Sequence, residues 1–269
     1  KINMPAQEVG KIGDGKTLKV DTGIGTVTFS SDFIKEIISS GSENIEFLIS
    51  RSYTEDLPQN VSDTIGNITV YSFSLNVDET PVSCSKLGEK FVIFEVDYTL
   101  KPGESPHKVI VYNIDDSGKF TIQKSNIYNA STGKIKFRLQ CFNSQYVVAH
   151  AEVSFDDIGN VLWAKESIEA LAARSIVRGI GGGNFNPNGY VTRAEFIKML
   201  MEAFDLIDEN ARCEFIDVKE GAWYYSAIAS AWKLGIVKGK DDFIFGVNDR
   251  ISREDMAVMV YRTAMLVKI

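Results

Sequence analysis

The chain has 269 residues and a mass of 29.9 kDa, a length that allows one large domain or two ordinary ones. Hydrophobic residues make up 44% and charged residues 24%, values that exclude disordered and fibrous classes. The formal net charge of -7 argues against nucleic acid or an anionic membrane surface as the main partner, because both select basic proteins.

Several other classes are excluded by motif. No uncharged apolar run is long enough for a membrane span. The three cysteines, Cys84, Cys141 and Cys213, lack CxxC spacing, and the chain has only 2 histidines, so we expect no metal site and no cofactor. Cys84 and Cys141 either pair with each other or remain buried free thiols. The chain opens with Lys1 rather than Met, which indicates a segment of a longer protein.

Residues 1–150 show the pattern of β-strands. Apolar and polar residues alternate in several runs, and clusters of turn-forming residues separate them. This pattern predicts an antiparallel β-sandwich. Residues 31–38 instead have helical spacing after a Ser31 cap, which predicts a short helix. The alternating runs are residues 68–75, 91–98, 108–114 and 134–139, and the turn clusters are residues 101–103, 115–118 and 129–133.

From about residue 151 the pattern is helical and repeats with an offset of 60 residues. Each unit is predicted to hold two helices joined by a loop, which is rich in glycine in the first unit. In the first unit the helices span residues 163–175 and 193–206. The inward positions are predicted to be Ile168, Leu171 and Ala172 in the first helix, and Phe196, Leu200 and Ala203 in the second. Matching pairs include Phe155 with Phe215, Asp157 with Asp217, Trp163 with Trp223, and Arg193 with Arg253.

These segments resemble two S-layer homology repeats. Residues 155–157, 163–164, 166–172, 176–179, 185–187 and 191–196 carry the first likeness. Residues 215–218, 222–224, 234–239 and 251–255 carry the second. Residues 98–104 and 120–146 are similar, more weakly, to the β-rich module that often precedes such repeats in clostridial surface proteins. We therefore expect a β-sandwich-like module at 1–150 followed by all-α repeats at 151–209 and 210–269.

The resemblance implies a function. S-layer homology repeats anchor proteins to the bacterial cell wall by binding secondary cell wall polysaccharide, often with pyruvate ketals. A non-catalytic anchoring module, located outside the cell in the cell wall or S-layer, is thus expected. The alternative is a structural S-layer component that acts through self-assembly. Catalysis finds little support in the residues, since Ser83, Cys84 and Ser85 have no nearby histidine.

Arg193 and Arg253 are the main candidates for polymer binding, and Glu195 is a further candidate beside Arg193. Thr192 and Glu195 form the pattern of a capping box, which leaves Arg193 at the first helical position beside the free N–H groups. A guanidinium there suits a sugar carboxylate. Arg253 has the same place, but Asp255 is a shorter cap, so we expect Arg193 to contribute more. Both arginines could instead be solvated helix starts; the repeat favours binding.

Other candidates have a structural alternative. Trp163 and Trp223 could stack on sugar rings, although we favour large core anchors. Asn184 can hydrogen-bond sugar hydroxyls, and Lys238 either meets an anionic polymer or belongs to a solvated face. Asp157 and Asp217 either face a groove or cap the first helix of each repeat, and capping is favoured.

The number of repeats has a structural consequence. In the family three repeats usually close a three-lobed unit, with the binding grooves between the lobes. Only two are present in this sequence. A repeat buries its apolar faces against its neighbours, so a missing neighbour leaves one face open. We therefore expect self-association, or a third lobe supplied by another chain.

Overall fold

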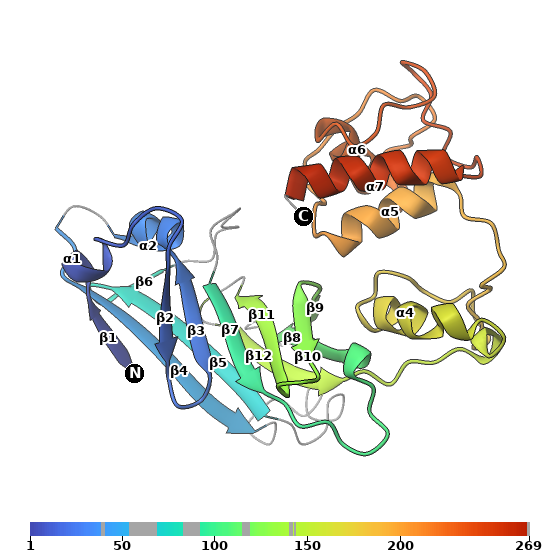
Figure 1. Cartoon of the computed structure of the whole chain (residues 1–269). Coiled ribbons are helices and arrows are strands. Elements are labelled where there is room, and N and C mark those ends of the chain that lie inside the picture. The colour runs from blue at the N-terminus through green and yellow to red at the C-terminus, as the bar shows by residue number, and fades with distance from the viewer. Residues whose placement is uncertain are drawn as a thin grey trace. The chain divides into compact units, whose positions relative to one another are not determined.

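The computed structural model describes residues 1–38, 41–53, 69–82, 92–114, 119–139, 142 and 144–267. The chain forms two compact units, Lys1–Val153 and Ser154–Ile269 (Figure 1). The change from strand to helix patterning near residue 150 falls close to this division. The pairing of Cys84 with Cys141 and the turn at residues 115–118 lie outside the described residues.

The described strands of the first unit form two antiparallel sheets (Figure 1). The larger sheet has the order β1-β4-β5-β12-β8-β9, with β6 paired to β5, and the smaller has the order β10-β11-β7-β3-β2. The larger sheet contains β1 (Ile2–Pro5), β4 (Asn44–Tyr53), β5 (Thr69–Val77), β6 (Thr80–Pro81), β8 (Val109–Ile114), β9 (Phe120–Gln123) and β12 (Ser144–His150). The smaller contains β2 (Thr17–Asp21), β3 (Thr26–Ser30), β7 (Val92–Asp97), β10 (Asn126–Asn129) and β11 (Lys134–Leu139).

Aromatic side chains from both sheets form one core. The rings of Phe73 (β5) and Phe94 (β7) meet edge to face with 4.9 Å between their centroids. The ring centroids of Phe137 (β11) and Tyr146 (β12) are 5.5 Å apart. These ring contacts join the inner faces of the sheets, as in a sandwich. Alternate residues along the strands are buried, for example in β11, because successive side chains point to opposite faces.

The predicted strands correspond to β5, β7, β8 and β11, which confirms an antiparallel β-rich N-terminal region. The predicted helix is α2 (Ser31–Ile37), but its cap is Ser30 rather than Ser31, since the Phe33 N–H donates to the Ser30 hydroxyl at 3.3 Å. The described residues of this unit also form the short helices α1 (Ala6–Val9) and η2 (Pro106–Lys108).

The second unit contains η3 (Asp156–Ile158) and the helices α4 (Leu162–Ala173), α5 (Arg193–Ala203), α6 (Tyr225–Lys233) and α7 (Arg253–Val267). Long loops join α4 to α5 and α6 to α7, and isolated β-bridges occur within them. An all-α description is therefore incomplete. The core of this unit joins α5, α6 and α7 with the loops around Phe215 and Phe245.

The predicted inward face of the second helix is partly wrong. Leu200 is buried, but Phe196 and Ala203 are only half-buried, and Ala194, Ile197 and Met201 take their place in the core. In α4, Ile168 is buried as predicted, whereas Leu171 is exposed. An apolar stripe spans a wide arc of a helix, so the pattern alone does not fix its centre.

In the part of the chain that the structure describes, no helix combines the length and apolar character needed to cross a membrane.

Candidate functional site

Each repeat has a long loop that a single aspartate fastens. The Asp157 carboxylate accepts hydrogen bonds from the N–H groups of Phe185 (2.8 Å) and Asn186 (2.6 Å). In the second repeat, the Asp217 carboxylate accepts from Phe245 (2.9 Å), Gly246 (2.8 Å) and Val247 (3.1 Å). The expected capping role is therefore wrong: the two aspartates hold the loops at residues about 28 positions further along the chain.

A glycine at the start of each loop allows this fold. A Cβ at Gly179 would lie 2.5 Å from the Asn184 carbonyl oxygen and 2.8 Å from the Phe155 ring. A Cβ at Gly239 would lie 2.5 Å from the Phe215 ring, and the φ of Gly239 is +77°. Each loop thus packs its backbone directly against the phenylalanine that opens its repeat, and a side chain would push the two apart.

The loop aspartates are stabilised as anions. The N–H donated by Phe185 lowers the pKa of Asp157. Burial raises the pKa of Asp217, but the hydrogen bonds from Phe245, Val247 and Gly246 outweigh it, so the pKa of this carboxyl is also lowered. A carboxyl with a lowered folded pKa stabilises the fold above its unfolded pKa, near 4. That stability is lost as pH falls through the folded pKa.

Acid should therefore release the loops, and Asp217→Asn should reproduce the effect at neutral pH. The amide keeps one acceptor oxygen and turns an NH₂ group toward backbone donors. We expect a loss of about 1–2 kcal/mol, reduced from the usual value for charge-assisted hydrogen bonds because the carboxylate is partly exposed. Hydrogen exchange at the amides of Phe245, Gly246 and Val247 measures this directly. Exchange unchanged in the variant would contradict the fastening role.

The helix starts differ between the repeats. In α5 the Thr192 hydroxyl accepts from the Glu195 N–H (3.2 Å), and the Glu195 carboxylate accepts from the Thr192 N–H (2.7 Å), so the predicted capping box is present. In α7 the Ser252 hydroxyl accepts from the Asp255 N–H at 3.1 Å. The Asp255 carboxylate, however, receives a hydrogen bond from Arg193 at 2.7 Å.

Arg193 connects the two repeats. The residue is 6% exposed, and its guanidinium forms an ion pair with Asp255 at the start of α7. The Nε–H donates to the Phe245 carbonyl oxygen at 3.0 Å, and the guanidinium carbon lies 5.0 Å from the Phe245 ring centroid. The expectation that Arg193 offers a free guanidinium to a ligand is therefore corrected. Arg253, its equivalent on α7, is exposed.

Both candidate tryptophans lie on the surface. Trp163 is 88% exposed and Trp223 is 58% exposed. The Trp223 ring makes an edge contact with the Tyr224 ring, with 5.2 Å between the ring centroids. The favoured interpretation as core anchors is wrong. Trp163 lies in the first turn of α4, and Trp223 lies two residues before the start of α6. Such rings are available to a ligand.

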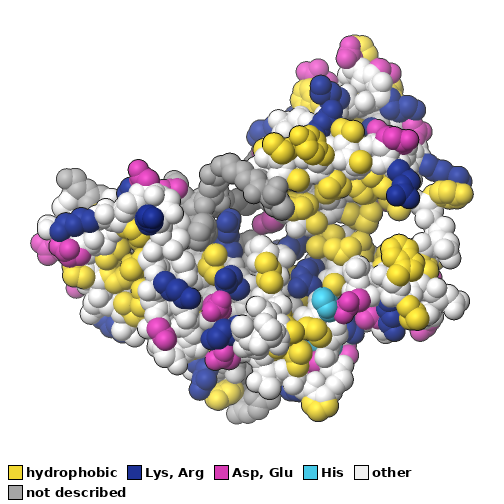
Figure 2. Space-filling model, in the orientation of Figure 1, with side chains coloured by type: hydrophobic (Ala, Val, Ile, Leu, Met, Phe, Trp, Pro, Cys, Tyr) yellow, Lys and Arg dark blue, Asp and Glu magenta, His cyan; other side chains and the backbone are white. Residues whose placement is uncertain are grey.

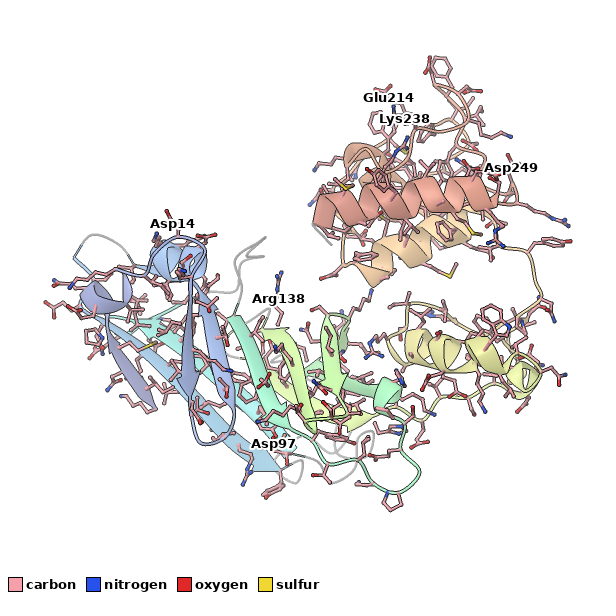
Figure 3. All side chains as sticks on the ribbon, in the orientation of Figure 1. Asp14, Asp97, Arg138, Glu214, Lys238 and Asp249 are labelled. Atoms are coloured by element: carbon pink, nitrogen blue, oxygen red, sulfur yellow. The ribbon has the colours of Figure 1, made fainter. Side chains whose placement is uncertain are left out.

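The remaining candidates differ in accessibility. Asn184 is half-buried, and its amide donates to the Gly182 carbonyl oxygen at 3.3 Å, inside its own turn. The Glu195 carboxylate is engaged in the capping box. Lys238 is exposed and projects on the side of Glu214 (Figure 3), where Gly239 packs against the Phe215 ring. Its neighbours Lys233 and Lys240 form ion pairs with Asp208 and Asp249.

One pair was missed by the sequence interpretation. The Arg250 guanidinium carbon lies 3.4 Å from the centroid of the Tyr190 ring, and Tyr190 is largely exposed. The two residues occupy equivalent positions of the repeats, and Arg250 also forms a β-bridge with Thr192, two residues after Tyr190. The offset of 60 residues shows that Tyr190 and Arg250 are equivalent, but it does not show that the two side chains are in contact.

A search against protein-family models identifies the family of these repeats. The model described as S-layer homology domain matches residues 154–197 and 214–257, which confirms the resemblance. The chain carries two S-layer homology domains. The matched ranges have the same offset as the repeated loops and include the fastening aspartates and both tryptophans.

Curated relatives share these domains. An amylopullulanase of Thermoanaerobacterium thermosulfurigenes is 38% identical over 168 residues, which is 62% of this chain and 9% of that protein. Endo-1,4-beta-xylanase A of Thermoanaerobacterium saccharolyticum is 46% identical over 104 residues, which is 39% of this chain and 9% of that protein. S-layer protein sap of Bacillus anthracis is 35% identical over 114 residues, which is 42% of this chain and 14% of that protein. The first alignment is longer than the second unit, so it extends into the β-rich unit.

The chain spans about a tenth of the length of the relatives named amylopullulanase and xylanase. The S-layer homology domain is a non-catalytic anchoring module, and these enzymes match this chain only over that small share. The domains and the S-layer relatives indicate a location at the bacterial cell surface, in the cell wall.

Proposed function

We propose that the second unit attaches a larger surface protein to the bacterial cell wall by binding secondary cell wall polysaccharide that carries pyruvate ketals. The observation that carries the proposal is the exposure of Trp163 and Trp223 at equivalent positions of two S-layer homology domains. An exposed indole recurs at the same position of both domains, and indole faces suit the C–H surfaces of sugar rings.

Exposed basic side chains support an acidic polymer. The protein as a whole has a net charge of -7, which opposes an anionic ligand, so the attraction must be local. Lys238 and Arg253 are exposed, and Arg250 is stacked on an exposed tyrosine ring. A guanidinium binds a carboxylate through two parallel hydrogen bonds, which selects a pyruvate carboxylate over a neutral sugar.

Co-sedimentation with purified cell wall tests the proposal. The protein should pellet with walls that bear the polymer and stay in solution once the polymer is chemically removed. Polymer stripped of its pyruvate groups should bind at least about tenfold more weakly, because one charge-assisted contact is lost. High salt should weaken binding in the same direction. Equal binding to stripped walls would rule out the polymer as the ligand.

A structural role in a surface lattice is the second candidate. The relatives include proteins named S-layer protein, and α7 presents exposed apolar side chains (Val258, Val260, Tyr261, Met265 and Leu266). Lattice assembly would proceed without wall polymer, so pelleting of the protein alone would favour this role.

A further inference from the structure

The chain leaves the β-rich unit through a short segment that this unit holds in place. β12 ends at His150, and the exit segment, residues 151–153, follows it and leads to the second unit. The Ala151 N–H donates to the Lys108 carbonyl oxygen at 2.9 Å. The Lys108 ammonium donates to the Val153 carbonyl oxygen at 3.1 Å. The exit segment is thus bonded to η2 beyond the end of the last strand.

The imidazole of His150 adds a further attachment. Its side chain is 4% exposed, and both ring nitrogens have partners. The Ser105 N–H donates to Nε2 at 3.0 Å, and Nδ1 lies 3.1 Å from the Glu152 carboxylate. A backbone N–H only donates, so Nε2 carries no proton, and the proton of the neutral ring is on Nδ1, facing Glu152. The ring therefore joins the loop before η2 to the exit segment.

The loop that donates to the imidazole is itself fixed. The Glu104 carboxylate accepts hydrogen bonds from the Tyr98 hydroxyl at 3.1 Å and from the Lys101 N–H at 2.9 Å. Burial and the nearby Glu104 carboxylate raise the pKa of Tyr98, so its hydroxyl stays protonated and remains a donor. The Lys108 N–H donates to the Ser105 carbonyl oxygen at 3.0 Å. The Ser105 N–H therefore has a set position beside the ring.

We propose that His150 is a pH-sensitive clamp, which releases the exit segment when its imidazole takes up a second proton. The protonated ring has two N–H donors and no acceptor. Its Nε2–H would then meet the Ser105 N–H, and the hydrogen bond between them is lost. Imidazoles take up this proton in the mildly acidic range. The clamp is therefore closed at higher pH and opens as the pH falls through that range.

The charged groups around the ring leave this effect in place. The Glu152 carboxylate favours a protonated ring, but it is 89% exposed, so water weakens the attraction. Lys108 carries a like charge on η2, and Glu104 is engaged with Tyr98. Acidic and basic side chains are intermixed over the face of the first unit that Figure 2 shows. The response to pH thus depends on the two bonds of the ring itself.

An open clamp changes how firmly the two units are connected. The bonds with Lys108 then hold the exit segment without the imidazole, so the segment opens more often. This effect is independent of what the second unit binds. It also occurs at a higher pH than release of the loops held by Asp157 and Asp217, because carboxyls take up protons only at about pH 4.

Nuclear magnetic resonance of the whole chain tests the clamp. At about pH 7.5 the nitrogen shifts of the His150 ring should show the proton on Nδ1. The Ser105 amide should lose about fivefold of its protection from hydrogen exchange between about pH 7.5 and pH 5.5, the change expected for one hydrogen bond. Protection is taken relative to the unfolded chain, which removes the intrinsic pH dependence of exchange.

Two variants separate the clamp from other effects of pH. The amide oxygen of His150→Gln accepts from the Ser105 N–H and does not titrate, so protection should be equal at both pH values. His150→Phe keeps a ring without an acceptor, so protection should be low at both. His107→Gln is the matched control, because His107 is exposed, and it should behave as the parent. A parent that responds to pH no more than His150→Gln overturns the proposal, as does a neutral ring with its proton on Nε2.

Cleavage after Glu152 measures the freedom of the exit segment. A protease specific for glutamate should cut there at least about fivefold faster in His150→Phe than in His150→Gln, compared at one neutral pH, because cleavage requires an open segment. Circular dichroism confirms that both variants are folded. Equal rates of cleavage would show that Lys108 holds the segment without the imidazole, and the clamp would then be rejected.

Discussion

Replacing Arg193 with alanine is expected to lower the stability of the second unit by about 2–3 kcal/mol. The change removes an ion pair of 2.7 Å, a hydrogen bond of 3.0 Å and the packing of the guanidinium on Phe245. Loss of one partner from a fully buried pair costs about 3–5 kcal/mol. Asp255 is half exposed and can be rehydrated, so a lower value applies. The melting temperature should fall by roughly 10 °C.

Thermal unfolding followed by circular dichroism at the helix band measures this change. Arg193→Lys should fall between the parent and the alanine variant, because the charge is kept and the planar fork is lost. Arg253→Ala is the matched control. Its side chain is exposed, so the melting temperature should change by only a degree or two. A stable Arg193→Ala protein that no longer binds wall polymer would restore the interpretation of Arg193 as a ligand-binding residue.

The repeat and its local signals could be predicted from the sequence. The offset of 60 residues identified equivalent helices, and the capping box at Thr192 and Glu195 fixed the start of α5. Both depend on short-range rules: helical periodicity and a hydrogen-bond exchange across three residues. The alternating runs predicted β-strands for the same reason, since strand periodicity is local.

The partners of charged groups could not be predicted in this way. Asp255 lies 62 residues from Arg193, and Asp217 lies 28 residues from Phe245. Nothing in a local pattern shows that a loop returns to a particular carboxylate. The interpretation of Arg193 assumed that a residue at a helix start meets solvent. In the fold, the following repeat covers that start, and the charge is used for the contact between repeats.

The exposure of the tryptophans also could not be predicted from the sequence pattern. A tryptophan beside an amphipathic helix is compatible with a core anchor and with a surface platform, because its position in the sequence does not show which elements pack beside it. Trp232 of the same unit lies between the two cases. It is 37% exposed, yet its ring makes an edge contact with the buried Phe215 ring, with 6.2 Å between the ring centroids.

Trp163→Ala and Trp223→Ala are expected to weaken polymer binding by about 2 kcal/mol each, or roughly 30-fold, while leaving the fold intact. The large exposed fractions of the indoles mean that little packing is lost on truncation. The larger effect should follow Trp163→Ala, because that ring is the more exposed. If the two repeats bind one polymer chain together, the double variant should lose more than either single variant, since the second contact benefits from the first.

Trp232→Ala serves as the control for a partly exposed indole that also packs on the Phe215 ring. It should lower the melting temperature through the lost contact with Phe215, whereas its effect on polymer affinity should be small in the folded fraction. Calorimetric titration of purified polymer into each variant, alongside thermal unfolding, separates the two effects. Unchanged affinity in the folded Trp163→Ala, Trp223→Ala double variant would move the binding site away from the tryptophans, toward Tyr190, Arg250 and Lys238.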